Sequence, residues 1–412
     1  MKLSCLIFPA VLLIIPEILI SQIPGCTDRM AVNYNNTATV NDGSCIYNPI
    51  PVSPVSGVEL PAQLNETSGL IKWNHYIWTH NDDTDLNIYA LDTVSGSIVQ
   101  YCTLAGAVNN DWEEISQDNE YIYIGDFGNN ANGNRDDLKI LKISKNSILS
   151  GPPVIEEISF SYSDQTDLDP AGPNNTDFDC EAFIVSDDSI FLFTKQYISN
   201  RTSLYSLPKT PGTFIAKLKA TLDVQGLITG AVFLESEKLI VLCGYSSSLD
   251  PFLYLLYDFT DKDFFSGNKR KISIESSFLQ IEGITTSNGL KYFITNEKLT
   301  LGNILTVAPK LQILDLSSYL DYYLDIKTDG WDDRSLKNYT VFPVPADDFI
   351  SVKSDSNFGQ SDYLIFDLAG HKIRTGTLPE EDPSISVERL PSGLYLLKIG
   401  KKQGDIYKIV KK

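Results

Sequence analysis

The sequence predicts an all-β protein that consists of a β-propeller of five blades, alternatively six, followed by a small β-sandwich. A short core sequence recurs five times between residues 55 and 316, and strand-like segments follow each copy. Residues 336–412 contain short stretches of alternating apolar and polar residues, separated by Gly, Pro and Asp turns. The aromatic content of 11%, with 21 Tyr and 19 Phe, suits the half-buried faces of β-sheets.

The overall charge excludes some classes of partner. The 412 residues carry 53 Asp and Glu against 33 Lys and Arg, a formal net charge of −20. Binding of nucleic acid needs a positive face, so we expect no nucleic-acid partner. An acidic excess favours a solvated surface and is compatible with bound cations. Only three His residues are present, which leaves little material for His-based catalysis.

The first 21 residues have the pattern of a signal peptide, with Lys2 before a short apolar run that Pro9 and Pro16 interrupt. We expect no transmembrane anchor in the mature chain, because no later run approaches the length of a membrane span. Five cysteines remain after removal of this segment. Cys26 and Cys45 are expected to form a disulfide in an oxidising environment, whereas the other three lie in strand-like stretches that predict core packing: Cys102, Cys180 and Cys243.

Residues 22–54 form a small cassette with a linker. The segment from Gly25-Cys26-Thr27-Asp28 to Asp42-Gly43-Ser44-Cys45 resembles a cassette of exported Bacteroidetes proteins, GCTDxxAxNYxxxAxxxDGSC, at every fixed position. One disulfide closing a loop of this length stabilises such a module by roughly 3 kcal/mol. Its Asp and Asn residues either ligate calcium or satisfy turns, and turns are the favoured interpretation. The proline-rich residues 47–54 predict a linker.

The repeats predict the propeller, residues 55–335. The five cores are Ser68-Gly-Leu70, Glu113-Glu-Ile115, Glu181-Ala-Phe183, Thr229-Gly-Ala231 and Glu282-Gly-Ile284. Four strands at this period make one blade. The last copy lacks a fourth strand, and residues 55–60 could supply it and so close the ring. A long β-sandwich or a β-helix is the alternative.

If each core lies on an innermost strand, acidic side chains surround one end of the central channel. We predict a metal site there, formed by Glu66, Asp111, Glu113, Asp179, Glu181 and Glu282. Ligands that are all oxygen suit Ca²⁺ better than a transition metal. The alternative, which is the favoured interpretation, is that these groups bond neighbouring blades and line a wet channel. The cores also weakly resemble those of calcium-dependent propeller hydrolases such as gluconolactonases and esterase-like phytases, a resemblance that assigns no catalytic residue.

A second polar cluster follows the second strand of three repeats, at residues 78–83, 125–130 and 295–297. We expect these segments to form loops on one face. His80 is the candidate general base there, but a structural hydrogen-bonding role is the favoured interpretation.

The last 77 residues, 336–412, are predicted to form an immunoglobulin-like β-sandwich. Their motifs resemble the type A sorting domain of the type IX secretion system. The matching residues are Pro343, Pro345, Ala346, Asp367, Gly370, Gly393, Tyr395 and Lys411. Val344 departs from the Asn usual in the first motif. The resemblance implies that type IX machinery exports the chain across the outer membrane, removes this domain, and releases the protein or attaches it to the cell surface. A generic accessory domain is the alternative.

Two functions follow from these features. The first is a secreted or cell-surface propeller that binds an extracellular glycan or protein. The second is a calcium-dependent hydrolase of an ester, lactone or phosphoester at the channel mouth.

Overall fold

The computed structural model describes residues 22–302, 304–328, 339–354, 361–367, 372–378, 383–399 and 405–412. The predicted signal peptide, residues 1–21, lies outside these ranges. The chain divides into two compact units, one ending at Tyr319 and the other beginning at Leu320. Among the described residues, no helix has the length and apolar character needed to cross a membrane.

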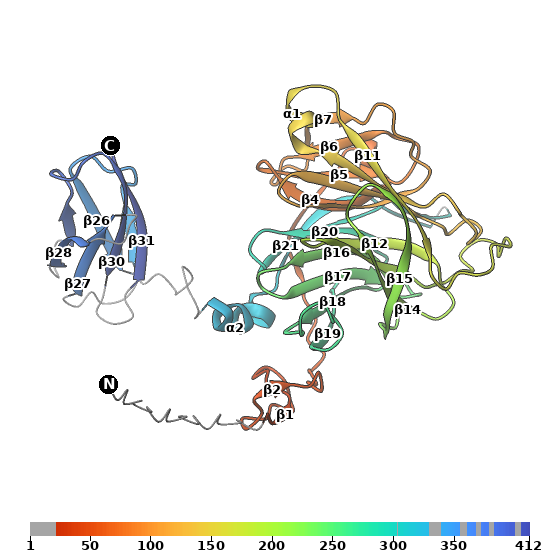
Figure 1. The fold of residues 1–412 in the computed structure, drawn as a ribbon, viewed down its shortest axis with the longest axis horizontal. Helices are drawn as coiled ribbons and strands as arrows, with labels where there is room; N and C mark the ends of the chain where they lie inside the picture. Colours follow the sequence, from red (N-terminus) through yellow and green to blue (C-terminus); the bar gives the residue numbers. More distant parts are fainter. Residues whose placement is uncertain are drawn as a thin grey trace, which may run out of the picture. The chain divides into compact units, whose positions relative to one another are not determined.

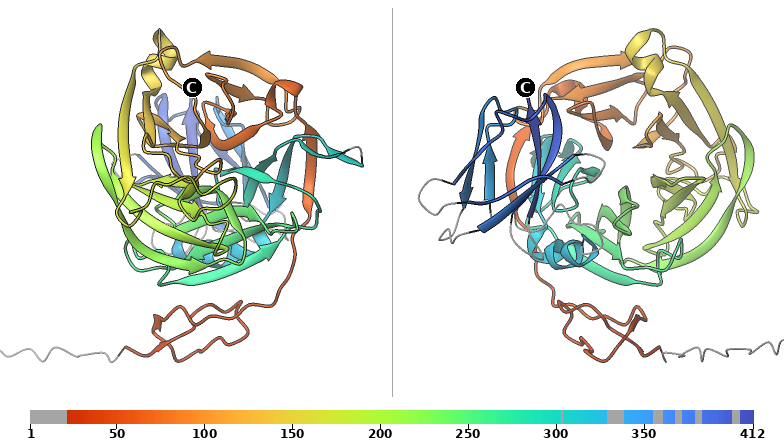
Figure 2. Two further views of the ribbon diagram at one scale, coloured as in Figure 1. Left: turned by 90° about the vertical axis from the view of Figure 1, so that its right-hand side faces the viewer. Right: turned by 60° about the vertical axis from the view of Figure 1, so that its left-hand side comes forward.

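The first unit is all-β and propeller-like, with sheets arranged around a common axis (Figures 1 and 2). The chain first forms the sheet β4 (Thr67–Trp73), β5 (Tyr76–Asn81), β6 (Asn87–Leu91) and β7 (Ile98–Thr103). It continues through β8 (Trp112–Gln117), β9 (Tyr121–Asp126), β10 (Lys139–Ser144) and β11 (Ile155–Tyr162). The next strands are β12 (Asp179–Val185), β13 (Ser189–Lys195), β14 (Arg201–Pro208) and β15 (Gly212–Asp223). A further sheet contains β16 (Leu227–Leu234), β17 (Leu239–Tyr245), β18 (Pro251–Tyr257) and β19 (Asn268–Ser273).

The last sheet of this unit joins the two ends of the repeat region. It contains β20 (Ile281–Thr286), β21 (Lys291–Asn296), β24 (Lys310–Asp315) and β3 (Pro54–Glu59). As predicted, the strand that precedes the first repeat, β3, completes the last sheet. It pairs antiparallel with β24, for example Val58 with Leu311. The parallel pairing of β11 with β15 merges two sets of strands into one eight-stranded sheet. Short elements complete the unit: the hairpin β22 (Leu299–Leu301) and β23 (Leu305–Val307), α1 (Lys145–Ser150) and η1 (Ala62–Leu64).

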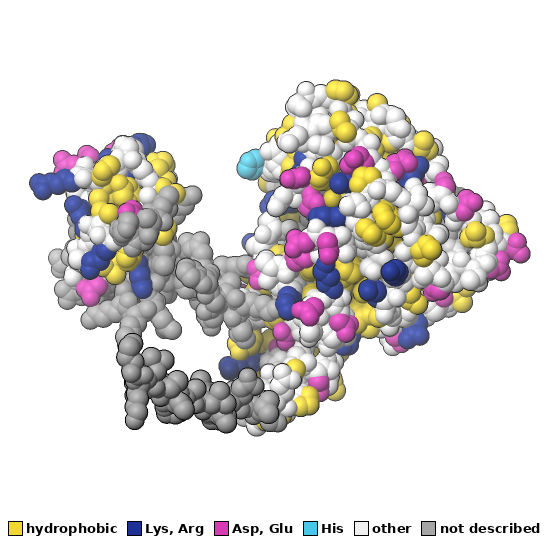
Figure 3. All heavy atoms as spheres, in the orientation of Figure 1, with side chains coloured by type: hydrophobic (Ala, Val, Ile, Leu, Met, Phe, Trp, Pro, Cys, Tyr) yellow, Lys and Arg dark blue, Asp and Glu magenta, His cyan; other side chains and the backbone are white. Residues whose placement is uncertain are grey.

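The apolar cores lie between neighbouring sheets. One core combines Trp78 of β5 with Ile124 of β9, and another combines Phe193 of β13 with Leu242 of β17. Cys180 and Cys243 are fully buried, as predicted, whereas Cys102 on the outer strand β7 is only half-buried. Side chains alternate between the two faces of a strand, so both faces of a sheet contribute to the cores between neighbouring sheets. Acidic and basic side chains are interspersed on the visible surface, which suits a solvated protein (Figure 3).

The cassette contains the predicted disulfide Cys26–Cys45 and the short parallel pair β1 (Pro24–Gly25) and β2 (Val40–Asn41). Its polar side chains satisfy turns, the favoured interpretation of the sequence. Asp28 Oδ1 accepts a hydrogen bond from the Met30 N–H at 2.8 Å, and Asn41 Oδ1 accepts one from the Gly43 N–H at 2.9 Å.

The cassette is docked on the sheet β16–β19, and the predicted linker takes part in the docking. Asp28 Oδ2 accepts hydrogen bonds from the hydroxyls of Tyr47, at 2.8 Å, and Tyr257, at 2.6 Å. The guanidinium carbon of buried Arg270 lies 4.7 Å from the ring centroid of Tyr47 and 4.8 Å from that of Tyr319. The Val52 N–H donates to Ser273 O at 2.9 Å, so residues 47–54 are not a free linker.

The second unit packs two sheets around a shared apolar core. The three-stranded sheet contains β25 (Tyr339–Phe342), β26 (Phe349–Ser354) and β29 (Ser384–Ser386). The four-stranded sheet contains β28 (Lys372–Leu378), β27 (Ser361–Phe366), β30 (Gly393–Ile399) and β31 (Asp405–Lys411). Ile350, Ile385 and Leu397 are among the core residues. The helix α2 (Ser317–Thr328), which was not predicted, precedes this domain.

The stacking of Arg270 between two tyrosines gives a first prediction. The substitution Arg270→Ala should lower the free energy of unfolding by about 2 kcal/mol, because two partly desolvated cation–π contacts are lost. Urea unfolding measures this change. The control Arg201→Ala, on the exposed start of β14, should stay within about 0.5 kcal/mol of the parent protein. Equal losses in the two variants would contradict the assigned role of Arg270.

Candidate functional site

The innermost strands turn acidic side chains toward the axis by a shared irregularity. In β8, β12, β16 and β20 the pairing register shifts by one residue, as in a β-bulge. The extra residues are Glu113, Glu181, Thr229 and Glu282. A bulge leaves its extra residue outside the ladder and re-aims the side chain. In β4 the shift comes after Ser68, so the first repeat departs from the other four.

A pocket of about 380 Å³ lies at the end of the axis where the inner strands begin and the second strands end. Glu113, Glu181 and Glu282 of the predicted channel set line it together with residues of the second predicted cluster, Asp82 and Glu297. The structure therefore unites two groups of residues that the sequence placed separately. Asn130 and Gln280 add amide groups to the lining.

One group of carboxylates includes two residues of the pocket lining, Glu113 and Glu181, together with Asp179. Oxygen atoms of Glu113, Asp179 and Glu181 lie within 4.8 Å of one another, and the exposed fractions of these residues are 6%, 0% and 2%. Asp179 Oδ1 accepts a hydrogen bond from the Asn129 N–H at 2.5 Å, whereas its Oδ2 has no partner among the described residues. Burial, and then the neighbouring Glu181, raises the pKa of Glu113 well above its ordinary value. We name Glu113, Asp179 and Glu181 the inner cluster.

Lys195 neutralises part of the inner cluster and was missed by the sequence analysis. Its ammonium group forms an ion pair with Glu181, and both side chains are buried. Nζ lies 5.4 Å from the ring centroid of Tyr197 and 5.2 Å from that of Tyr245. Burial lowers the pKa of Lys195, but Glu181 and then Tyr245 outweigh it and raise that pKa well above its usual range. The available signal was its position at the end of the second strand, opposite Asp179.

A second group lies apart from the inner cluster. Oxygen atoms of Glu66, Asp82 and Glu297 lie within 4.8 Å of one another. We name these three residues the outer cluster. Burial, followed by the charges of Glu66 and Asp111, raises the pKa of Asp82 to about 7. The predicted set of six ligands is thus divided, because Glu66 groups with two residues outside that set.

Asp111 and Glu113 flank the loop after β9. A Cβ atom added at Gly128 would lie 2.3 Å from Asp111 Oδ2 and 2.3 Å from Glu113 Oε1, so only glycine fits between them. Burial, and then Asp179, raises the pKa of Asp111 to about 6.

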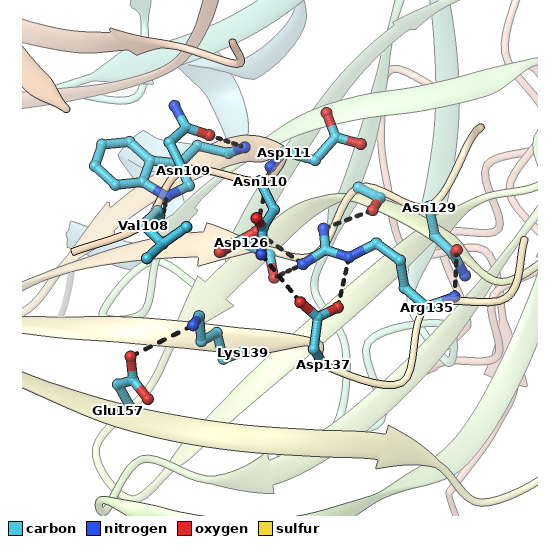
Figure 4. Close-up of polar contacts among 12 residues, drawn as sticks. Val108, Asn109, Asn110, Asp111, Asp126, Asn129, Arg135, Asp137, Lys139 and Glu157 are labelled. Atoms are coloured by element: carbon cyan, nitrogen blue, oxygen red, sulfur yellow. Dashed lines mark hydrogen bonds and ion pairs between the residues drawn. The ribbon is translucent and has the colours of Figure 1, made fainter. Parts of the chain in front are cut away.

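Arg135 connects this loop to the side chains of Asp126 and Asp137 (Figure 4). Its Nη2 lies 2.9 Å from Asp126 Oδ1, its Nε 2.8 Å from Asp137 Oδ1, and its Nη1 donates to Gly128 O at 2.8 Å. Asp126 Oδ1 also accepts the Asp111 N–H at 3.2 Å, whereas Asp126 Oδ2 has no partner among the described residues. The arrangement fixes the backbone that presents Asn129 to Asp179.

Glu114 bonds β8 to the backbone of β16 and was also missed by the sequence analysis. Its Oε1 accepts the Ile115 N–H at 2.9 Å, and its Oε2 accepts the Ala231 N–H of β16 at 2.8 Å. The equivalent residues of the other repeats are small: Gly69, Ala182, Gly230 and Gly283. A Cβ atom at Gly69 would lie 2.6 Å from Glu114 Oε1, so that glycine makes room for the carboxyl group. Burial raises the pKa of Glu114 well above its usual range.

His80 does not belong to the pocket. It lies within β5, not in the expected loop, and its exposed fraction is 0%. Its ring packs edge-on against Trp112 at 5.9 Å, and Nδ1 lies 3.1 Å from Asn81 O. Burial lowers the pKa of His80 to about 4. The expectation of a loop histidine was therefore wrong, because the second strand continues through this residue.

The sorting-motif residues divide between core and surface. Ala346 is fully buried, and its N–H donates to Val410 O at 2.7 Å. The Tyr395 hydroxyl donates to Pro391 O at 2.9 Å, and Gly393 opens β30 opposite Lys411. Pro343 and Pro345 lie between β25 and β26, and Asp367 directly follows β27. Gly370 lies outside the described residues.

The two adjacent glutamates of β8 should respond differently to substitution. Glu114→Ala leaves two buried N–H groups without an acceptor and should lower the free energy of unfolding by about 2–4 kcal/mol. Glu113 accepts no hydrogen bond from the described residues. Glu113→Gln should therefore leave the free energy of unfolding unchanged or raise it. Urea unfolding of both variants at neutral pH tests the contrast. Similar destabilisation of both would contradict it.

The acidic pocket should also make stability depend on pH. The unfolded chain releases the Asp82 proton near its ordinary pKa of 3.8, whereas the folded protein retains it up to about 7. The folded state therefore binds more protons between these values, and stability falls as pH rises through them. In the presence of EDTA, Asp82→Asn should melt near the parent at pH 4 and above it at pH 8. A constant difference at both pH values would rule out this titration.

The chain is similar to one family model and, distantly, to solved structures. No curated protein matches the sequence. The structure resembles an exo-β-1,3-galactanase from Phanerochaete chrysosporium, with 12% identity over 88% of this chain and 100% of that chain and a TM-score of 0.41. It also resembles a β-fructofuranosidase from Bombyx mori, with 10% identity over 88% of each chain and a TM-score of 0.37. Likeness at this level carries no functional argument. Residues 340–412 match the family model described as the secretion system C-terminal sorting domain, so the chain carries a sorting domain of this family at its C-terminal end.

Proposed function

We propose that this protein is a type IX secretion cargo whose first unit is a five-bladed propeller that binds an extracellular ligand. A signal peptide at residues 1–21 would carry it through the inner membrane, and the sorting domain, an immunoglobulin-like sandwich, would carry it through the outer membrane. The family match of residues 340–412 supports the second step. The five sets of four strands, the last completed by β3, support the blade number.

The observation that carries the binding function is the pocket at the end of the axis. Side chains from four different sheets converge there, including Asp82, Glu181, Tyr245 and Glu297. Its volume of about 380 Å³ lies in the range of small-ligand sites. The pocket is concave, so a flat protein surface would not fill it. Carboxylates, amides, a lysine and tyrosine hydroxyls together offer acceptors and donors. This chemistry favours a hydroxyl-rich ligand, so a glycan is preferred over a protein.

A divalent cation is part of the proposal. Every candidate ligand in the pocket is a carboxylate oxygen, which suits Ca²⁺. The carboxylates outnumber the single ammonium group of Lys195 that lines the pocket. Bound Ca²⁺ would offset their mutual repulsion and would present open coordination positions to ligand oxygens.

One observation favours the second candidate, a calcium-dependent hydrolase. Asp82 combines a position in the pocket with a pKa of about 7, a value useful for proton transfer near neutral pH. No histidine among the described residues lines the pocket, so a carboxyl group would have to act as the base.

A single set of variants of the chain from residue 22 to residue 412 tests both functions. On a glycan array, Glu181→Gln and Glu282→Gln should each weaken binding by about 10-fold, since each removes a charged hydrogen-bond acceptor. The control Asp169→Asn, in an exposed loop, should bind as the parent does. Binding that both pocket variants leave unchanged would refute the pocket as the ligand site.

The same proteins are assayed against aryl esters, lactones and phytate. Calcium-dependent turnover by the parent that both variants lose would establish the hydrolase. An inactive parent protein would eliminate it and leave the binding function.

A further inference from the structure

The outer cluster lies where the ring of sheets closes. Glu66 directly precedes β4 and Asp82 directly follows β5, so both belong to the first sheet of the repeat region. Glu297 follows β21 of the last sheet. The strands β4 and β20 of these two sheets lie side by side. The three carboxylates therefore come from the two sheets that the chain must bring together to close the ring.

Backbone hydrogen bonds determine the positions of these residues. The Asp82 N–H donates to Glu66 O at 3.1 Å, and the Glu297 N–H donates to Gln280 O at 3.1 Å. Across the closure, the Lys298 N–H donates to Asn65 O at 2.7 Å. The backbone thus holds the carboxylates close together without any attraction between their side chains.

The outer cluster lacks the compensation found in the inner cluster. Glu181 has its ion pair with Lys195, and Asp179 accepts a backbone N–H. In the described part of the chain, by contrast, no hydrogen bond or ion pair reaches the carboxylates of Glu66, Asp82 and Glu297. At longer range, Lys298 acts on Glu66 and Lys195 acts on Glu297. Like charges at this separation repel strongly when they are partly buried.

Glu282 provides an independent indication of a ligand. Its exposed fraction is 4%, and its Oε2 has no hydrogen-bond partner among the described residues. It lines the same pocket as Asp82 and Glu297, and the charges of Lys195, Glu297 and Asp82 all act on it. A buried carboxylate oxygen without a partner is costly, and a cation placed between Glu282 and the outer cluster would satisfy it.

We propose that Glu66, Asp82 and Glu297, with an oxygen of Glu282, bind a Ca²⁺ ion that ties the first sheet to the last. Ca²⁺ accepts six to eight oxygen ligands at flexible geometry, so these side chains leave positions for water or for ligand oxygens. This site excludes the inner-cluster residues of the predicted set of ligands, because the ammonium group of Lys195 already forms an ion pair with Glu181 there. It rests on the proposed function only in that the ion would share the ligand pocket.

Isothermal titration of residues 22–412 with CaCl₂ after EDTA treatment tests the assignment. The parent should bind one ion, and Asp82→Asn and Glu297→Gln should each weaken binding by about 10-fold or more. Glu113→Gln in the inner cluster and Asp169→Asn on the surface should bind as the parent does. Circular dichroism establishes that each variant is folded.

Melting temperatures give a second readout with opposite signs. Ca²⁺ should raise the melting temperature of the parent, because the ion binds only the folded ring. In EDTA at pH 8, Asp82→Asn should melt above the parent, since one repelling charge is gone, and Ca²⁺ should no longer raise its melting temperature.

Two results would overturn the assignment: no heat and no thermal shift with the parent, or loss of binding in Glu113→Gln while Asp82→Asn keeps it. Failure of the ligand function is recognised separately. Normal Ca²⁺ binding together with a glycan array that responds to neither pocket variant would leave the ion site and remove the ligand.

Discussion

The placement of the apolar cores between neighbouring sheets governs the rest of the first unit. Each sheet buries both faces against its neighbours, as Trp78 does toward Ile124 and Phe193 toward Leu242. The axis is then lined by the edges of the innermost strands, where little apolar surface is available. Polar groups can gather there provided that each finds a partner, and Glu114 shows the principle by bonding the backbone of β16.

The register shift of the inner strands converts this polar axis into a site. Glu113, Glu181 and Glu282 are extra residues in their ladders, so their side chains are free to face the pocket. The shortage of positive charge then leaves two stable outcomes, protonation or a bound cation. Lys195 neutralises one carboxylate of the inner cluster through its ion pair with Glu181. The outer cluster has no such ion pair in the described part of the chain. The two clusters therefore differ in chemistry although members of both line one pocket.

Both ends of the repeat region are tied to other segments. The N-terminal strand β3 completes the last sheet, and the cassette docks on β16–β19 through Asp28, Tyr257 and Arg270. A module that is too small to build a core of its own thus gains both a disulfide and an apolar and polar contact surface. Together these contacts hold the end of the chain that supplies β3.

The sequence by itself determined the features that depend on local pattern. These are the strands, the repeats, the closure by residues 55–60, the Cys26–Cys45 pair and the motifs of the sorting domain. It also indicated the acidic character of the axis. Only the tertiary structure decided which acids meet, because Glu66, Asp82 and Glu297 approach one another only when the first and last sheets come together. His80 was misplaced because sequence pattern does not mark where a buried strand ends. Glu114 was missed because its acceptor role depends on the Ala231 N–H of β16, which is distant in the chain and lies close only in the folded ring. Lys195 was missed although its partner Glu181 lies on the neighbouring strand of the same hairpin, because sequence pattern does not show that this lysine is buried.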